Sequence, residues 1–137
     1  MARCISPELI AQMMKLGHGD EIAFVDADFP AYACGSSIIR ADGIDMLTML
    51  KGILPLLPLD TYCDKPAVMM DVAGNQPKPD VWAAYADRIA EYHKPFQEFE
   101  FIERYTFYER AKKCRSIVIT GETDGNIILR KGTVADQ

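Results

Sequence analysis

The order of apolar and polar positions along the chain predicts helices and strands in alternation. Apolar residues recur at helical spacing in four stretches, and short continuous apolar runs, typical of strands buried on both faces, lie between them. We expect helices over residues 7–16, 43–53, 81–93 and 107–113, and strands over residues 22–26, 67–70, 98–102, 115–120 and 126–130. Residues 27–40 are rich in Pro, Gly and Ser, so we expect a loop there, with at most a short extended piece at Ile38 and Ile39.

Residues with known capping preferences mark the ends of the expected helices. Ser6 before Pro7 is typical of a helix N-terminus, because serine accepts a backbone N–H there and proline lacks one. Asp42, before Gly43, is interpreted as the N-cap of the second helix. His93 is interpreted as the C-terminal cap of the third.

Strands that alternate with helices predict one α/β domain over residues 1–137, with a mostly parallel sheet covered by helices on both faces. Sites in such sheets form at the carboxyl ends of the strands, where Asp26 and the turn at residues 121–125 are expected. His18 precedes the strand that Asp26 follows, so a straight strand at ~3.3 Å per residue separates them by roughly 20–25 Å. Either the loops converge on one cleft, or a second subunit completes the site.

Composition and charge narrow the class of protein. The chain is 49% hydrophobic with a net charge of −5, whereas a nucleic-acid-binding protein normally presents a basic face. No apolar run reaches the ~18 residues that a membrane span requires, and the N-terminus lacks the apolar centre of a secretory signal. Four scattered cysteines without a C-x-x-C pair are interpreted as free thiols. We therefore expect a cytoplasmic protein that binds neither nucleic acid nor membrane.

His18 is the leading candidate for catalysis. It lies between two glycines, and an imidazole titrates near neutral pH, as a general acid/base must. The alternative is a loop histidine without a role. Asp20 and Glu21 either orient this histidine or form a surface pair, and the spacing H-x-D-E matches no metal site. No nucleotide-binding motif occurs either, so we expect neither a metal nor a cofactor.

Three other polar residues have an ordinary structural interpretation beside a functional one. Asp26 ends an apolar strand, so it either pairs with a polar group or forms a turn. Arg104 forms either a surface ion pair or a contact with a polar ligand. Asn126 follows a glycine at a turn, where asparagine is favoured for backbone reasons alone.

Short motifs spread over nearly the whole chain carry a family resemblance. They are SPEL (6–9), LGHGDEI (16–22), DADFP (26–30), IRADG (39–43), LLPLDTY (56–62), FYERAKK (107–113), and VITGE with GNIILRKG (118–132). Each motif alone is weakly specific, but the ordered set resembles the fucose mutarotase / ribose pyranase family. GHGDEI, IRADG and FYERAKK favour the fucose branch.

This resemblance implies a ribose pyranase-like fold and an isomerase, independent of metal and cofactor, that interconverts the α and β anomers of L-fucose or a related monosaccharide. By their places in the motifs, His18 corresponds to the proton donor, and Asp26 and Arg104 correspond to sugar-binding residues. Members of the family form ring-shaped decamers with sites at subunit contacts, so the resemblance also implies a homo-oligomer. Such an assembly reconciles a histidine and an aspartate that lie at opposite ends of one strand.

One motif departs from the family pattern. A Tyr-Gly-Asn tripeptide of the family corresponds to Asp124, Gly125 and Asn126, in a shorter loop. Gly125 and Asn126 keep the match, and Asp124 takes the place of the tyrosine, where it becomes a candidate acceptor for a sugar hydroxyl. Two alternatives to the mutarotase stay open. One is a non-catalytic sugar-binding or regulatory protein that lost turnover with the tyrosine, and the other is a metal-dependent isomerase that uses the histidine and the two acids after it.

Overall fold

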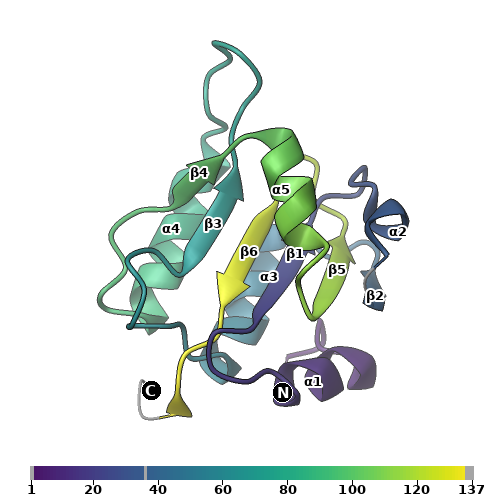
Figure 1. The fold of residues 1–137 in the computed structure, drawn as a ribbon, viewed down its shortest axis with the longest axis vertical. Helices are drawn as coiled ribbons and strands as arrows, with labels where there is room; N and C mark the ends of the chain where they lie inside the picture. Colours follow the sequence, from purple (N-terminus) through teal and green to yellow (C-terminus); the bar gives the residue numbers. More distant parts are fainter. Residues whose placement is uncertain (1, 36, 135–137) are drawn as a thin grey trace.

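A six-stranded sheet forms the centre of the molecule, which the computed structural model describes for residues 2–35 and 37–134 (Figure 1). The strands are β1 (Glu21–Val25), β2 (Ser37–Ala41), β3 (Ala67–Met70), β4 (Glu100–Ile102), β5 (Ser116–Thr120) and β6 (Ile127–Arg130). Their order across the sheet is β2-β5-β1-β6-β3-β4. Among these described strands, only β6 runs against its neighbours, so the expected mostly parallel sheet is confirmed.

Continuous apolar sequence explains why the central strands lie in the middle of the fold. Every residue of β5 is buried, and so are the last four residues of β1, because helices cover both faces of the sheet. The first three residues of β6 are buried as well. The expected strands over β1, β3, β4, β5 and β6 are confirmed to within one or two residues at each end.

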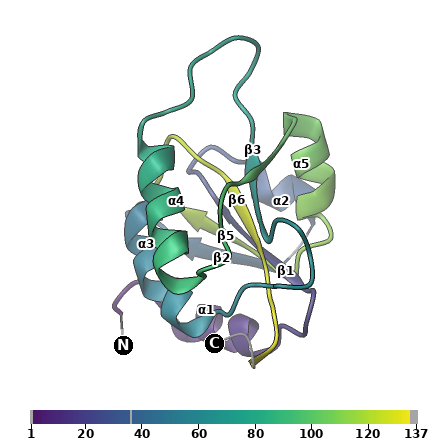
Figure 2. The same cartoon turned by 90° about the vertical axis from the view of Figure 1, so that its left-hand side faces the viewer.

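Helices cover both faces of the sheet, as the sequence predicts. They are α1 (Pro7–Met14), α2 (Ala31–Cys34), α3 (Met46–Ile53), α4 (Val81–Tyr92) and α5 (Arg104–Ala111), and a 3-10 turn at Leu54–Leu56 follows α3. One buried cluster joins α1, α3 and α4 to one face of the sheet, and a second cluster joins α2 and α5 to the other. Figure 2 shows α3 and α4 on one side of the strands and α5 on the opposite side.

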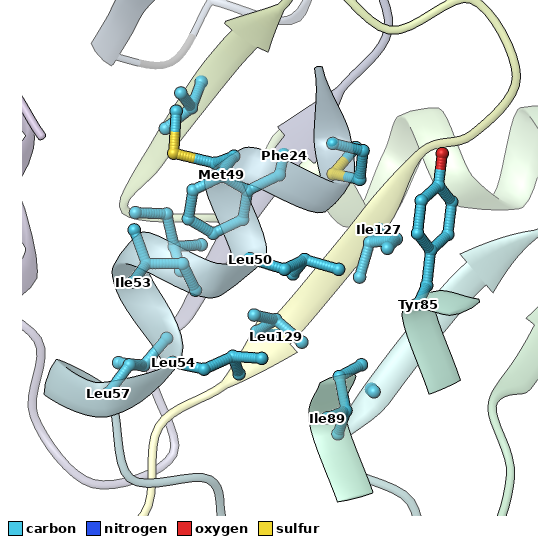
Figure 3. Close-up of a cluster of buried hydrophobic side chains, with 14 of the residues drawn as sticks. Phe24, Met49, Leu50, Ile53, Leu54, Leu57, Tyr85, Ile89, Ile127 and Leu129 are labelled. Atoms are coloured by element: carbon cyan, nitrogen blue, oxygen red, sulfur yellow. The ribbon is translucent and has the colours of Figure 1, made fainter. Parts of the chain in front are cut away.

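Buried apolar side chains pack α3 and α4 against the sheet and so fix the positions of both helices (Figure 3). Phe24 and Ile127 from the sheet, Leu50 from α3, and Ile89 and Tyr85 from α4 are all fully buried in this cluster. Complete burial of one such apolar side chain contributes roughly 1.5–3 kcal/mol. Helix α4 is therefore held rigidly against the start of β6.

The start of α3 differs from the sequence prediction. Asp45 is the N-cap, and its carboxylate accepts the backbone N–H of Thr48 at 2.8 Å. Asp42 forms an ion pair with Arg40 at 2.9 Å instead. Gly43 has a positive φ of 80°, so the chain turns there before it enters the helix. The assignment of Asp42 as the N-cap is therefore wrong.

The segment of residues 27–40 contains more secondary structure than a loop. Helix α2 and most of β2 lie in it, whereas the sequence predicts only a short extended piece at Ile38 and Ile39. A four-residue helix is too short to reveal a 3.6-residue period, and Gly35 ends it with a left-handed φ of 73°. Because β2 is an edge strand and partly exposed, it also lacks a continuous apolar run.

The expectations about Ser6, His93 and the cysteines are confirmed. Ser6 caps α1 by accepting the backbone N–H of Leu9 at 3.1 Å, and the His93 backbone N–H closes α4 on the carbonyl of Ile89 at 2.8 Å. The four cysteines are free thiols. Across residues 2–35 and 37–134, we find no helix with the length and apolar character to cross a membrane.

The ends of the strands define two edges of the sheet. At the upper edge in Figure 1, strands β1, β3 and β5 end and β6 begins. At the lower edge, β1 begins and β6 ends. The segments that flank β1 and β6 therefore contribute side chains to both edges.

Candidate functional site

An aspartate and an asparagine contact each other at the upper edge. The antiparallel register pairs Phe24 with Ile127, which brings Asp26 after β1 beside Asn126 before β6. Oδ1 of Asn126 accepts the backbone N–H of Asp26 at 2.8 Å, and its Nδ2 donates to the Asp26 carboxylate at 3.1 Å. The backbone N–H of Asp28 donates to the other carboxylate oxygen at 3.1 Å. The Asn126 side chain therefore orients the Asp26 carboxylate.

Partial burial changes the acidity of Asp26. Desolvation raises the pKa of this carboxyl above its usual value, and the hydrogen bonds from Asn126 and from the Asp28 backbone oppose the change only in part. A carboxylate that has lost part of its water is a stronger hydrogen-bond acceptor than one in bulk solvent. Asp26 is therefore suited to bind a ligand hydroxyl, beyond its role in the local turn.

A cavity of about 570 Å³ lies beside this pair. The end of β3, the segment after it and the start of α5 line the cavity, through Met70, Asp71, Val72, Ala73, Gly74, Glu103, Arg104 and Tyr105. Nδ2 of Asn126 lies 3.9 Å from Sδ of Met70, so Met70 links the Asp26–Asn126 pair to the cavity, although neither member of the pair lines it. The volume is typical of small-molecule sites.

Arg104 brings a cation and an aromatic group to this cavity. It is the first residue of α5, and its Nε donates to the hydroxyl of Tyr108 at 2.7 Å. The guanidinium also lies 5.4 Å from the ring centre of Tyr105 and 5.5 Å from that of Tyr108. Phe29 packs edge-on against Tyr108 at 5.2 Å. The exposed guanidinium is thus held by aromatic residues, with donors left over for a ligand.

The loop before β6 is fixed by α4. Nε1 of Trp82 donates to the backbone carbonyl of Asp124 at 2.5 Å, while the Asp124 side chain is exposed and accepts the hydroxyl of Thr123. A Cβ at Gly125 would lie 3.0 Å from the ring of Tyr85, so only glycine fits without a shift. The backbone of Asp124 and Gly125 therefore supports Asn126, and no described contact joins the Asp124 side chain to Asp26.

Glu122 is a site-supporting residue that the sequence analysis did not single out. Its Oε1 accepts the hydroxyl of Tyr85 at 2.7 Å and the first N–H of α3, from Met46, at 3.2 Å. Its backbone carbonyl accepts the N–H of Ala27, the residue after Asp26, at 2.8 Å. Glu122 therefore joins α3, α4 and the end of β1, and its place in the motif VITGE was the available signal.

Tyr85→Phe is expected to destabilise the protein by about 1.5–3 kcal/mol at neutral pH, the usual range for a hydrogen bond to a charged group. Burial raises the pKa of Glu122, but hydrogen bonds from Tyr85 and from backbone N–H groups outweigh burial and lower that pKa overall. The stabilisation by Glu122 is therefore complete above its unfolded pKa and is lost as the pH falls through the folded value. Urea unfolding at neutral and acidic pH should show that the free energy of unfolding of Tyr85→Phe is lower than that of the wild type, and that this difference becomes smaller in acid. Tyr92→Phe, at the half-exposed end of α4, is the control.

A histidine, a buried aspartate and an arginine form a second polar group at the lower edge. Nε2 of His18 lies 2.9 Å from Oδ1 of Asp60, and Nε of Arg130 donates to Oδ2 of Asp60 at 2.9 Å. Asp60 is 1% exposed, whereas the His18 side chain is 43% exposed. Sequence reasoning missed Asp60, because it lies 42 residues from His18 and its only signal was the motif LLPLDTY.

The charge on Asp60 determines the form of the imidazole. Burial raises the pKa of Asp60, but hydrogen bonds from the Tyr62 backbone, His18 and Arg130 outweigh it and set that pKa to about 2. An ionised carboxylate only accepts hydrogen bonds, so Nε2 of His18 must carry a proton. Nδ1 is therefore the ring nitrogen left free to exchange a proton with a ligand.

The acids next to His18 have other partners. Asp20 accepts the backbone N–H of Gly17 at 2.7 Å, and Glu21 forms an ion pair with Arg110 at 2.6 Å. Neither contacts the His18 side chain among the described hydrogen bonds, so the hypothesis that they orient it is not supported by the structure. Within residues 2–35 and 37–134, no group of three or more His, Cys, Asp or Glu side chains is arranged to hold a metal ion.

The two polar groups lie at opposite ends of β1. His18 precedes the strand at the lower edge, and Asp26 follows it at the upper edge. The loops do not fold back to join them, so a single chain presents two separate groups. The described contacts of His18 and Asp26 share no residue, in agreement with their places on either side of β1.

Comparisons with known proteins agree with this architecture. Residues 1–134 match the model of the RbsD / FucU transport protein family. The fucose mutarotase from Streptococcus pneumoniae, solved in complex with L-fucose, is 38% identical with a TM-score of 0.89, over 98% of this chain and 97% of that one. FucU from Bifidobacterium longum is 35% identical with a TM-score of 0.92, over 98% and 99%. RbsD from Bacillus subtilis, complexed with D-ribose, is 19% identical with a TM-score of 0.69, over 95% of both chains, and shares the fold.

Proposed function

We propose, because the chain belongs to the RbsD / FucU transport protein family, that it is a monosaccharide mutarotase, an isomerase, acting on L-fucose or a related sugar. The observation that carries this proposal is the His18–Asp60 pair, an exposed imidazole whose Nε2 is anchored on a buried carboxylate. The similarity to the fucose mutarotase from S. pneumoniae supports the substrate class. Activity in the cytoplasm is part of the same proposal.

The anchored imidazole suits the chemistry of mutarotation. Nδ1 of His18 takes the proton of the anomeric hydroxyl, and the oxygen left behind forms a carbonyl with C1. The bond between C1 and the ring oxygen breaks, its electron pair moves to the ring oxygen, and that oxygen receives the proton back from Nδ1 of the imidazolium. Rotation about the C1–C2 bond and the reverse steps close the ring on the other face. The buried Asp60 stabilises the imidazolium formed in between.

We propose that the upper edge binds the sugar and that His18 of a second copy reaches it. In this proposal Asp26 accepts one sugar hydroxyl, Arg104 donates to another, and Asn126 with residues 124–125 holds Asp26 in place beside the cavity. Two observations support shared sites: the cavity is lined by the segment after β3 and the start of α5, whereas His18 precedes β1 at the other edge of the sheet, and the His18 side chain is 43% exposed. A decamer, as in the family that the sequence resembles, is one assembly that brings the two edges together.

The test of this function is saturation-transfer NMR on equilibrated L-fucose, with D-ribose and L-rhamnose as a small panel. Exchange between the α and β anomeric protons should accelerate in the presence of the protein. No acceleration with any of these sugars would contradict the mutarotase and favour a non-catalytic sugar-binding protein. The exposed Asp124 in the place of the family tyrosine is the observation behind that second candidate. Turnover that is indifferent to Asp124→Ala would remove Asp124 from the sugar-binding set.

The apolar part of the cavity predicts a preference between two closely related sugars. Met70, Val72 and Ala73 line one side of it, and L-galactose differs from L-fucose by a hydroxyl on C6. We expect kcat/KM for L-galactose to be lower by roughly 10–100-fold, the penalty that an apolar pocket imposes on an added hydroxyl. Exchange rates for both sugars under the same conditions measure the ratio. Ala73→Ser should reduce the ratio of kcat/KM for L-fucose to that for L-galactose. An unchanged ratio would mean that the C6 group does not contact this part of the cavity.

A further inference from the structure

Tyr62 is an exposed aromatic residue that contacts the proposed acid/base. Its side chain is 78% exposed, and its ring centre lies 5.1 Å from that of His18, with the ring planes tilted by 58°. Its backbone N–H donates at 3.0 Å to Oδ1 of Asp60, the same oxygen that lies 2.9 Å from Nε2 of His18. The tyrosine and the histidine are therefore tied to one carboxylate oxygen.

This arrangement leaves the imidazole limited freedom. The Asp60 bond holds one edge of the ring at Nε2, but a single hydrogen bond at an exposed position still allows the ring to swing, and water competes for the carboxylate. The Tyr62 ring lies beside the imidazole and limits its swing towards that side. Ring contacts of this kind prefer tilted geometries, as the 58° between these ring planes shows.

We propose that Tyr62 is a positioning residue for His18, whose ring keeps Nε2 on Asp60 and Nδ1 directed outward for proton transfer. The proposal rests on the proposed mutarotase function, in which Nδ1 exchanges the proton. The phenol hydroxyl has no part in it: the ring alone positions the imidazole. Since the Tyr62 side chain is mostly exposed in the single chain, its removal costs the fold of that chain little, and a kinetic effect can be separated from unfolding of the chain.

The kinetic test compares two substitutions of the same residue. Tyr62→Ala should lower kcat for anomer exchange by roughly 10-fold, as a misplaced acid/base does, while KM changes less than about 2-fold. Tyr62→Phe keeps the ring and should retain wild-type kcat. Equal losses in both variants would overturn the proposal, because the hydroxyl would then be the active part. A rise in KM with unchanged kcat would overturn it too, since Tyr62 would then bind the sugar directly. Tyr92→Ala is the matched control.

A second measurement does not depend on turnover. The chain has two histidines, so ¹⁵N NMR of the labelled imidazoles gives two sets of signals, and His18→Ala assigns them. In Tyr62→Ala, the His18 nitrogens should move towards the averaged values of a ring that exchanges tautomers, while the signals of His93 stay in place. Unchanged His18 signals would overturn the positioning role even in an active enzyme. Shifted signals in a protein without mutarotase activity would contradict the proposed function and leave the positioning of His18 established.

Discussion

Replacing His18 by alanine is expected to slow the α/β exchange of L-fucose by about 10²–10⁴-fold, the range that a positioned acid/base group contributes. The affinity for the sugar should change little, because Asp26, which we propose to bind the sugar, lies at the other end of β1. Saturation-transfer NMR measures the exchange rate and titration calorimetry measures the affinity. Lys15→Ala, an exposed substitution nearby in sequence, is the control for changes unrelated to the imidazole.

Asp60→Asn refines this test. The amide has about the same shape as the carboxylate, but it does not require Nε2 of His18 to carry the proton. The variant should therefore lose much of the activity while its imidazole is still present. If His18→Ala left the exchange rate unchanged, the assignment of His18 as the acid/base would be wrong, and the result would favour a non-catalytic sugar-binding protein.

Mixing two inactive variants is expected to restore activity. Asp26→Ala removes the carboxylate that we propose to bind a sugar hydroxyl, and His18→Ala removes the imidazole, so each variant lacks one half of the proposed shared site. If each site takes His18 from one copy and Asp26 from another, a random 1:1 assembly has about a quarter of its sites intact. Refolding the two variants together and measuring L-fucose exchange checks this expectation.

Two controls accompany the mixing experiment. Native mass spectrometry should confirm that mixed oligomers form, using a mass tag on one variant. A doubly substituted chain, with both His18→Ala and Asp26→Ala, should rescue neither partner. Mixed oligomers without recovered exchange would contradict the shared site and require a site within one chain.

The strands could be predicted well because their signal is local. Runs such as Ile22–Val25 and Ser116–Thr120 are buried on both faces, and continuous apolar sequence reports that directly. The predicted N-cap of α3 was wrong because Asp42 and Asp45 are equally suitable N-cap residues by type. Only the backbone turn at Gly43 decides between them. Local sequence does not encode that choice.

The candidate site was harder to predict than the strands, because its contacts join segments that are distant in the sequence. His18 and Asp26 were proposed from their residue types and motifs, and the structure places them on either side of β1. The partner of His18 lies 42 residues away, and the partner of Glu21, Arg110, lies 89 residues away. Such pairs depend on how the whole chain packs, which periodicity cannot report. Motif resemblance drew attention to LLPLDTY without giving Asp60 a role.

The position of β6 in the sheet determines when, during synthesis, the two polar groups can be completed. This strand lies late in the sequence but in the middle of the sheet, between β1 and β3. Asn126 at its start orients Asp26, and Arg130 at its end pairs with Asp60. During synthesis, the two halves of the sheet therefore cannot be joined until residues 127–130 have emerged. A chain that ends before residue 126 lacks both the asparagine that orients Asp26 and the arginine that pairs with Asp60, so both polar groups are completed only by the last strand.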